Sequence, residues 1–259
     1  MGRTRGSQSN MRESQDLFLS QDLPGPSSQG SVSSQRRTRN STLTSSQIMK
    51  SNIREKDMQL INSIIRYLFV ADHNKLPIQK SHIIKNVLDG NRKIFRSIME
   101  NVSEQLSEVF GYNLIEVESN KYLLVNEVEN QLPHLTFEDG HKQVLLYLIL
   151  VHIFMFGESC KEEILWDFLR HLGIITENNF QHEYFGDVHH LVTVEFVNQR
   201  YLDKTLIDRN DPTKFKYAWG SRAQNELTYR SALQFVADIY GCPINKWKLQ
   251  YKAVLEDEA

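Results

Sequence analysis

The chain has 259 residues, of which 40% are apolar and 24% are charged, and its formal net charge at pH 7 is -2. This length allows one or two domains with a buried core. Its two cysteines, Cys160 and Cys242, are too few for a disulfide framework or a cysteine-rich zinc site, and they fit a reducing intracellular compartment.

Residues 1–55 are predicted to form a disordered tail, because their scattered apolar residues cannot offset the entropy cost of ordering. The first fifty residues are basic, with seven Lys or Arg against three Asp or Glu, and "RRTR" at 36–39 could serve nuclear import or nucleic-acid binding. All six glutamines in those fifty residues follow a serine, whereas none of the ten later glutamines does. The serines are Ser7, Ser14, Ser20, Ser28, Ser34 and Ser46.

These Ser-Gln pairs are the preferred target of DNA-damage checkpoint kinases, so we expect phosphorylation of the tail. Each phosphate adds a charge of about -1.5 to -2, and a few of them would reverse the basic balance of the tail. The alternative is a low-complexity tail in which the pairs arose by chance.

The first domain is predicted over residues 56–128. A helix begins near Asp57 and ends at Leu76-Pro77, a second begins at Ser81 as its N-cap, and a third ends at Gly111. Their inward residues are expected to be Ile61, Ile64, Ile65 and Leu68, then Ile83, Ile84, Val87 and Leu88, then Phe95, Ile98, Met99, Val102, Leu106 and Val109. Two strands, "YNLIEVE" and "KYLLVN", follow and give the order of a winged helix.

A linker at 129–137 leads to a second domain at 138–259, in which the order repeats. The predicted elements are helices at His141–Phe156, Lys161–Leu172 and Asp187–Asn198, strands "YLDKTLID" and "KFKYAWG" around the turn "RNDPT", and helices at Ser221–Tyr240 and Ile244–Leu255. The apolar run from Val144 to Phe156 predicts a buried helix, since it is short for a membrane span. The predicted fold class is therefore mainly α with small β-wings, as tandem winged-helix domains after a disordered tail.

Five segments of the sequence together resemble the MAGE homology domain: "VFGYNLIEVE", "WDFLRHLG", "FGD", "EFVNQRYLDK" and "DPTKFKYAWGSRAQNELTYRSALQFV". The resemblance covers residues 57–256, and within the family it is greatest to the subunit of the SMC five-six chromosome-maintenance complex. It implies a nuclear, chromatin-associated scaffold for DNA repair and recombination, without catalysis or cofactor. The implied partners are a RING-type ubiquitin ligase subunit, which the scaffold stimulates, the kleisin subunit, and double-stranded DNA bound without sequence preference.

The resemblance also places the ligase contact at Leu68 and Phe69, where relatives carry a pair of leucines. By helical spacing Leu68 belongs to the core and Phe69 to its edge. After "FGD" the related subunit tends to be basic, while this chain has Val188, His189 and His190, which weakens a phosphate contact there.

Two further contacts are expected from the sequence. Leu146, Ile149 and Ile153 lie on a helix that is apolar almost all round, which predicts a groove for a kleisin helix or burial between the two domains. Basic residues around the second wing could contact DNA phosphates, although acidic residues interleave with them and a solvated wing is the alternative. These residues are Arg200, Lys204, Arg209, Lys214, Lys216 and Arg222.

A metal site at His182, Asp187, His189 and His190 is not expected, because the run crosses a loop and a helix cap. No familiar catalytic motif occurs, so we expect neither an enzyme nor a small-molecule substrate. Two rival functions remain open at this stage. One is a sequence-specific winged-helix transcription factor, and the other is a MAGE-type ligase adaptor outside SMC complexes.

Overall fold

The computed structural model describes residues 45–118, 120–127, 140–208 and 211–259. The described residues belong to one compact unit. Within it, helices and small antiparallel sheets follow the order of two winged helices, so the predicted fold class is confirmed.

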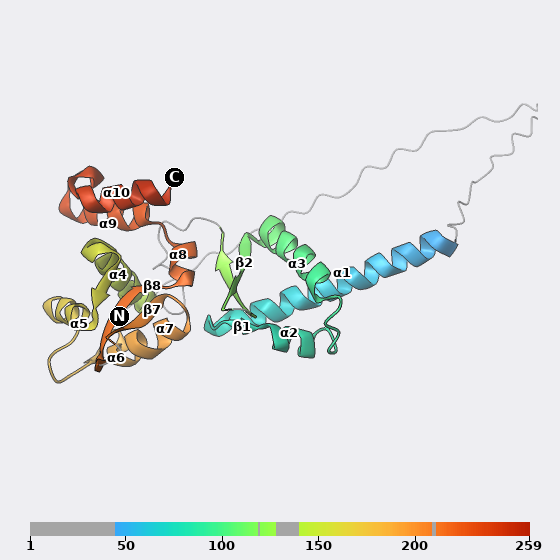
Figure 1. The fold of residues 1–259 in the computed structure, drawn as a ribbon, viewed down its shortest axis with the longest axis horizontal. Coiled ribbons are helices and arrows are strands. Elements are labelled where there is room, and N and C mark those ends of the chain that lie inside the picture. Colours follow the sequence, from blue (N-terminus) through green and yellow to red (C-terminus); the bar gives the residue numbers. More distant parts are fainter. Residues whose placement is uncertain (1–44, 119, 128–139, 209–210) are drawn as a thin grey trace, which may run out of the picture. The chain divides into compact units, whose positions relative to one another are not determined.

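The first winged helix combines three helices with a three-stranded sheet of order β1-β3-β2 (Figure 1). Its elements are α1 (Ser45–Ala71), a 3-10 turn (Asp72–Asn74), β1 (Ile78–Gln79), α2 (Lys80–Asn86), α3 (Phe95–Phe110), β2 (Tyr112–Val117) and β3 (Lys121–Asn126). Strands β2 and β3 pair antiparallel, with Leu114 opposite Leu124. Gly111 ends α3 with a φ of 66°, a left-handed conformation that glycine adopts without steric cost.

Three details of this domain differ from the prediction. Helix α1 begins at Ser45, inside the segment assigned to the tail, where the sequence up to Asp57 contains neither glycine nor proline. Gln79 rather than Ser81 is the N-cap of α2, because strand β1 ends at Gln79 and the helix follows without a loop. Val109 is 68% exposed, although its helical spacing placed it in the core.

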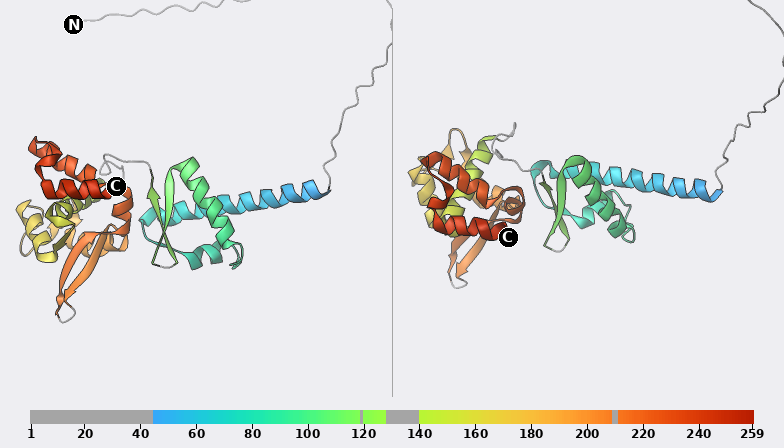
Figure 2. Two further views of the ribbon diagram at one scale, coloured as in Figure 1. Left: turned by 45° about the horizontal axis from the view of Figure 1, so that its top comes forward. Right: turned by 90° about the horizontal axis from the view of Figure 1, so that it is seen from above.

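The second winged helix repeats the arrangement with a sheet of order β4-β8-β7. Its elements are α4 (Gly140–Gly157), β4 (Ser159–Lys161), α5 (Glu162–His171), β5 (Gln181–His182), β6 (Gly186–Asp187), α6 (Val188–His190), a π-helical turn (Leu191–Glu195), α7 (Phe196–Asn198), β7 (Leu202–Asp208) and β8 (Asp211–Trp219). Figure 2 shows β7 and β8 as a long hairpin that extends beyond the helices of this domain. The predicted N-cap is confirmed, since the Asp187 carboxylate accepts a hydrogen bond from the His190 amide at 3.0 Å.

The C-terminal helices differ from the single Ser221–Tyr240 helix that the sequence predicted. The structure divides it into α8 (Ser221–Glu226) and α9 (Tyr229–Tyr240), followed by a 3-10 turn (Ile244–Lys246) and α10 (Lys248–Asp257). The cause lies at Thr228, which has an extended backbone and whose hydroxyl accepts a hydrogen bond from the Ser231 amide at 3.1 Å. A threonine in this role begins a new helix.

Helix α4 is the central helix of the second domain. By length and composition alone it could cross a membrane, but it packs in the core beneath α9 and α10. Its fully buried side chains include Leu145, Ile149 and Ile153. The interpretation of this apolar run as a buried helix is therefore confirmed.

Candidate partner-binding surfaces

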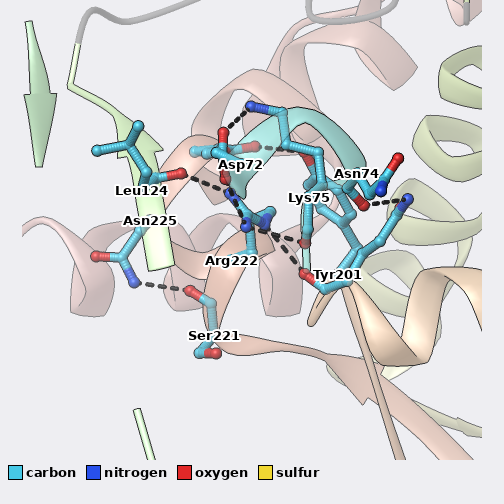
Figure 3. Close-up of polar contacts among 10 residues, drawn as sticks. Asp72, Asn74, Lys75, Leu124, Tyr201, Ser221, Arg222 and Asn225 are labelled. Atoms are coloured by element: carbon cyan, nitrogen blue, oxygen red, sulfur yellow. Dashed lines mark hydrogen bonds and ion pairs between the residues drawn. The ribbon is translucent and has the colours of Figure 1, made fainter. Parts of the chain in front are cut away.

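Arg222 joins the two winged helices through a buried network of polar contacts (Figure 3). Its guanidinium donates to the Leu124 carbonyl at 2.6 Å and the Lys75 carbonyl at 3.1 Å, and its Nη2 lies 3.4 Å from an Asp72 carboxylate oxygen. These three residues belong to the first domain. From the second domain, Gln199 contributes a carbonyl at 3.0 Å from the Arg222 Nε.

The charge of Arg222 is balanced inside the protein. Asp72 is buried and also pairs with Lys75, while Glu226 lies 3.3 Å from Arg222 and accepts a 2.7 Å hydrogen bond from the Tyr201 hydroxyl. Burial, reinforced by Glu226, raises the pKa of Tyr201 well above its usual value, so the phenol remains a donor. A buried arginine with five such partners fixes the junction and is not available to a DNA phosphate, which corrects the prediction for Arg222.

Gly220 brings the chain close enough for this network to form. Its amide donates to the Tyr201 carbonyl at 2.8 Å, and the Arg222 amide donates to the Arg200 carbonyl at 2.9 Å. A Cβ at Gly220 would lie 2.3 Å from the Arg200 carbonyl oxygen, so no other residue fits without displacing the backbone.

The predicted ligase-binding residues lie at an aromatic cluster on the first domain. Leu68 is fully buried, and Phe69 is half-buried with its ring 5.2 Å from Phe110 in an edge-to-face arrangement. Val70 and Val109, the sequence neighbours of this ring pair, are about 70% exposed. We call Phe69, Val70, Val109 and Phe110 the first-domain apolar surface.

The predicted kleisin groove on α4 is not open in this structure. Leu146 is 7% exposed, while Ile149 and Ile153 are fully buried in the core of the second domain. Helices α9 and α10 of the same domain cover α4, together with α5 and strands β4 and β8. The two predictions for this helix, a kleisin groove and burial between the two domains, are therefore wrong.

A different apolar surface is exposed at the connection between α9 and α10. Ile239, Tyr240 and Leu249 are 64%, 70% and 78% exposed, and the Tyr240 ring lies 5.8 Å from that of Trp247. Large apolar side chains grouped in this way are typical of a protein-binding surface. We call these four residues the C-terminal apolar surface.

Two predicted DNA contacts on the second wing have acidic partners. Arg200 forms an ion pair with Glu118 of the first domain. The Lys204 ammonium lies 3.2 Å from a Glu162 carboxylate oxygen and 4.2 Å above the Phe215 ring. Both side chains are less than one third exposed, so their charges are largely engaged within the chain.

The outer end of the wing is more accessible. Lys214 is exposed but pairs with Asp211 at 2.9 Å, and hydrogen bonds from Thr213 and Lys214 lower the pKa of Asp211 to about 2. Lys216 is exposed and has no acidic partner among the described residues. Arg209 lies outside the described residues.

The residues considered for a metal site have other contacts. The His182 Nδ1 accepts from the Tyr184 amide at 3.1 Å, and the His189 ring stacks on Trp166 at 5.7 Å. In the part of the chain that the structure describes, no three histidine, cysteine or acidic residues are grouped to hold a metal ion.

Most of the predicted phosphorylation sites lie outside the residues that the structure describes. Ser7, Ser14, Ser20, Ser28 and Ser34 lie outside the described residues, and Ser46 lies in the first turn of α1. Phosphorylation of these serines stays a prediction.

Sequence reasoning missed two features. It assigned Arg222 to the surface, although Gly220, the N-cap two residues earlier, was a signal of a close approach of the backbone at the start of α8. It also missed the exposure of Val109, Ile239 and Leu249, because helical periodicity does not show which apolar faces another element covers.

Comparison with known proteins identifies the family. The MAGE homology domain matches residues 64–132 and 118–230. The human protein "Non-structural maintenance of chromosomes element 3 homolog" is 35% identical over 210 residues, which cover 79% of this chain and 68% of the human protein. Human "Melanoma-associated antigen D2" is 31% identical over 199 residues, which cover 75% of this chain and 32% of that protein.

A solved structure is also similar. One chain of the "Nse1-Nse3-Nse4 complex" superposes with a TM-score of 0.69 at 33% sequence identity, and the alignment covers 78% of this chain and 98% of that chain. At this identity the likeness extends beyond fold to family. The protein described here belongs to the MAGE homology domain family.

Proposed function

We propose that this protein is a non-catalytic scaffold subunit of an SMC-type chromosome-maintenance and DNA-repair complex in the nucleus. The observation that carries the proposal is its likeness, over almost the full length of the matched chain, to one chain of the three-protein "Nse1-Nse3-Nse4 complex". A scaffold that joins two other proteins needs two separate binding surfaces, and the first-domain and C-terminal apolar surfaces are candidates for them.

The first-domain apolar surface is proposed to bind and stimulate the RING-type ubiquitin ligase subunit. Phe69 lies where the family resemblance places that contact, and its edge-to-face rings with Phe110 and Tyr112 hold a rigid aromatic platform. Rigid aromatic side chains bordered by exposed valines suit a buried interface, because they lose little conformational entropy on binding. Leu68 is fully buried and does not reach the surface.

The C-terminal apolar surface is proposed to bind the kleisin. It is a second exposed group of large apolar side chains, carried by helices from the opposite end of the described sequence. An amphipathic helix that lays its apolar face over Tyr240 and Leu249 would bury both of them. This assignment replaces the α4 groove.

Double-stranded DNA is the third proposed partner, contacted without sequence preference. On the second wing, Lys216 is proposed to contact DNA phosphates. Lys214 is a weaker candidate because it pairs with Asp211, and Arg209 stays a predicted contact. A sequence-specific transcription factor is not favoured, because α6, the π-helical turn and α7 contain neither lysine nor arginine and their Glu195 pairs with Lys142.

The experiment that tests this function is affinity capture of the tagged full chain from nuclear extract, with stoichiometric partners identified by mass spectrometry. The scaffold role predicts recovery of a RING-type ligase subunit and a kleisin together. Recovery of a ligase without a kleisin would replace it with a MAGE-type adaptor outside SMC complexes. Recovery of neither would refute it.

Variants at exposed positions make the capture informative. Val70→Asp with Val109→Asp is expected to remove the ligase subunit and leave the kleisin. Leu172→Asp, at a half-exposed apolar residue on the second domain, is the matched control that keeps both. Leu68 is unsuited to this test, because a charge at a fully buried position would unfold the domain.

A further inference from the structure

Basic residues are concentrated in one segment of the first winged helix. Residues 75–96 contain six lysines or arginines and one acidic residue, Asp89, whereas residues 97–126 contain five glutamates and only Lys121. The first domain as a whole has no net charge, so its net charge does not reveal this basic segment.

This segment borders a groove of about 1010 Å³ between α2, the loop that follows it and the tip of the first wing. The residues that supply polar groups to it include Gln79, Lys80, Ser81, Lys85, Arg92 and Asn120. A 2.9 Å hydrogen bond from the Lys80 amide to the Asn120 carbonyl joins the wing tip to the start of α2. This hydrogen bond links the two sides of the groove.

Two cations of this segment have acidic partners, Lys75 with Asp72 and Arg96 with Glu100, whereas the cations that border the groove have none among the described residues. Lys85, Arg92 and the adjacent Lys93 are exposed, and none of them forms an ion pair in the described part of the chain. Lys80 is half-buried, with its ammonium 4.9 Å above the Phe95 ring. Asp89 also lines the groove, so its lining carries three cations and one carboxylate, and this excess creates a positive potential that an anionic ligand relieves.

We propose that this groove is a binding site for the phosphate backbone of double-stranded DNA. Lysines, an arginine, a hydroxyl and side-chain amides are the donors that proteins use for phosphate oxygens. They lie on α2 and the loop before α3, and in a helix-turn-helix the first helix crosses the DNA backbone. An acidic peptide is less well matched, because Ile84 is the one apolar side chain among the lining residues described.

The proposal deepens the DNA contact of the proposed function and moves its main site from the second wing to the first domain. It needs neither partner protein, so partner capture and DNA binding can fail independently of each other. Contacts of this kind carry no base information, and affinity should fall steeply with salt.

The test is fluorescence anisotropy of a labelled duplex of arbitrary sequence, titrated with the full chain and its variants over a range of salt concentrations. The groove variant is Lys85→Glu with Arg92→Glu. The matched control is Lys246→Glu with Lys248→Glu, two exposed residues near the C-terminus that also lack an acidic partner among the described residues. All variants retain the basic tail, so the difference between them reports the groove.

The groove variant should bind the duplex about tenfold more weakly at about 0.1 M salt, and its salt slope should fall by about two, because each lost phosphate contact lowers it by about 0.9. The control should lose less than about twofold. Lys85→Arg with Arg92→Lys, which keeps both charges, should bind like the unaltered protein.

Equal losses in the groove variant and the control would overturn the proposal, since net charge alone would then explain the binding. Unchanged affinity in both would overturn it as well. So would a groove variant that keeps DNA affinity but loses an acidic phosphopeptide, which would make the site a peptide-binding one. Circular dichroism of each variant confirms that the fold is retained.

Discussion

The two winged helices follow the same order of elements but use their charged residues differently. In the second, Lys204 pairs with Glu162 of α5, Lys214 pairs with Asp211 of its own strand, and Arg222 is buried in the junction. In the first, Lys85 and Arg92 remain without acidic partners around an open groove. A count of basic residues along a wing therefore says little about DNA contact until their partners are known.

The domains also differ in how they bury apolar surface. The first leaves aromatic side chains at the edge of its core, next to Val70 and Val109. The second adds α9 and α10 to cover α4, and it exposes Ile239 and Leu249 on these added helices instead. The same architecture thus presents one apolar surface at a different place in each domain, which suits a scaffold for two proteins.

The largest expected effect comes from breaking the junction at Arg222. Arg222→Ala removes the donor from the Leu124 and Lys75 carbonyls and leaves Lys75 as the remaining ion-pair partner of the buried Asp72 carboxylate. We expect the free energy of unfolding to fall by about 3–5 kcal/mol, as for other buried ion pairs that lose one member. Urea unfolding followed by circular dichroism measures this.

The control for this loss is Arg230→Ala, which removes an exposed ion pair with Glu258. That change should cost far less than Arg222→Ala, because exposed ion pairs contribute little to stability. A similar small cost for Arg222→Ala would contradict the role of the network as the link between the two domains.

The second effect tests the close approach of the backbone that supports the junction. Gly220→Ala would place a Cβ 2.3 Å from the Arg200 carbonyl oxygen, so we expect destabilisation by about 1–3 kcal/mol. Gly173→Ala is the comparison, because a Cβ there meets nothing within 4 Å and only its φ of 72° opposes alanine, at a cost of about 1 kcal/mol. Equal shifts in melting temperature would argue against a steric requirement at Gly220.

A smaller effect is expected at the second wing. Lys216→Glu should weaken duplex binding by about threefold or less, since it reverses one unpaired charge rather than two at a formed groove. Anisotropy at matched salt compares it with the groove variant. A loss larger than that of Lys85→Glu with Arg92→Glu would return the main DNA contact to the second domain.

The smallest expected effect is a pH dependence of the second domain. His152 stacks on Phe168 with ring centroids 3.9 Å apart, and burial lowers its pKa from the ordinary 6.5. The unfolded chain then binds the proton more readily than the folded one, so stability is full above about pH 6.5 and falls as the pH drops below it.

His152→Phe keeps the stack and removes this titration. Urea midpoints measured at about pH 7.5 and about pH 5.5 should differ less in the variant than in the unaltered chain. An identical difference in both would assign the acid sensitivity to other groups.

Much of the architecture could be predicted from the sequence because its signals are local. Periodic apolar residues, the cap at Asp187 and the left-handed glycine at Gly111 each fix a helix end or face. The break at Thr228 was missed because residues 221–240 contain neither glycine nor proline to mark the end of a helix.

The candidate surfaces were harder to predict, because they depend on contacts between residues that are distant in sequence. Phe69 was placed correctly at the edge of the core by its angle on α1. Arg222 was misplaced because its partners Asp72 and Leu124 lie 150 and 98 residues away. The α4 groove was wrong for the same reason, since α9 and α10 cover it.

The most direct test of the scaffold role is a paired binding measurement with purified partners. Calorimetry would titrate the RING-type ligase subunit and a kleisin fragment onto the full chain, onto Val70→Asp with Val109→Asp, and onto Ile239→Asp with Leu249→Asp. All four positions are exposed, so folding should be retained. The scaffold account predicts that the first variant loses only the ligase subunit and the second loses only the kleisin. Loss of both partners from one variant, or of neither from both, would contradict the claim that the two winged helices bind different proteins.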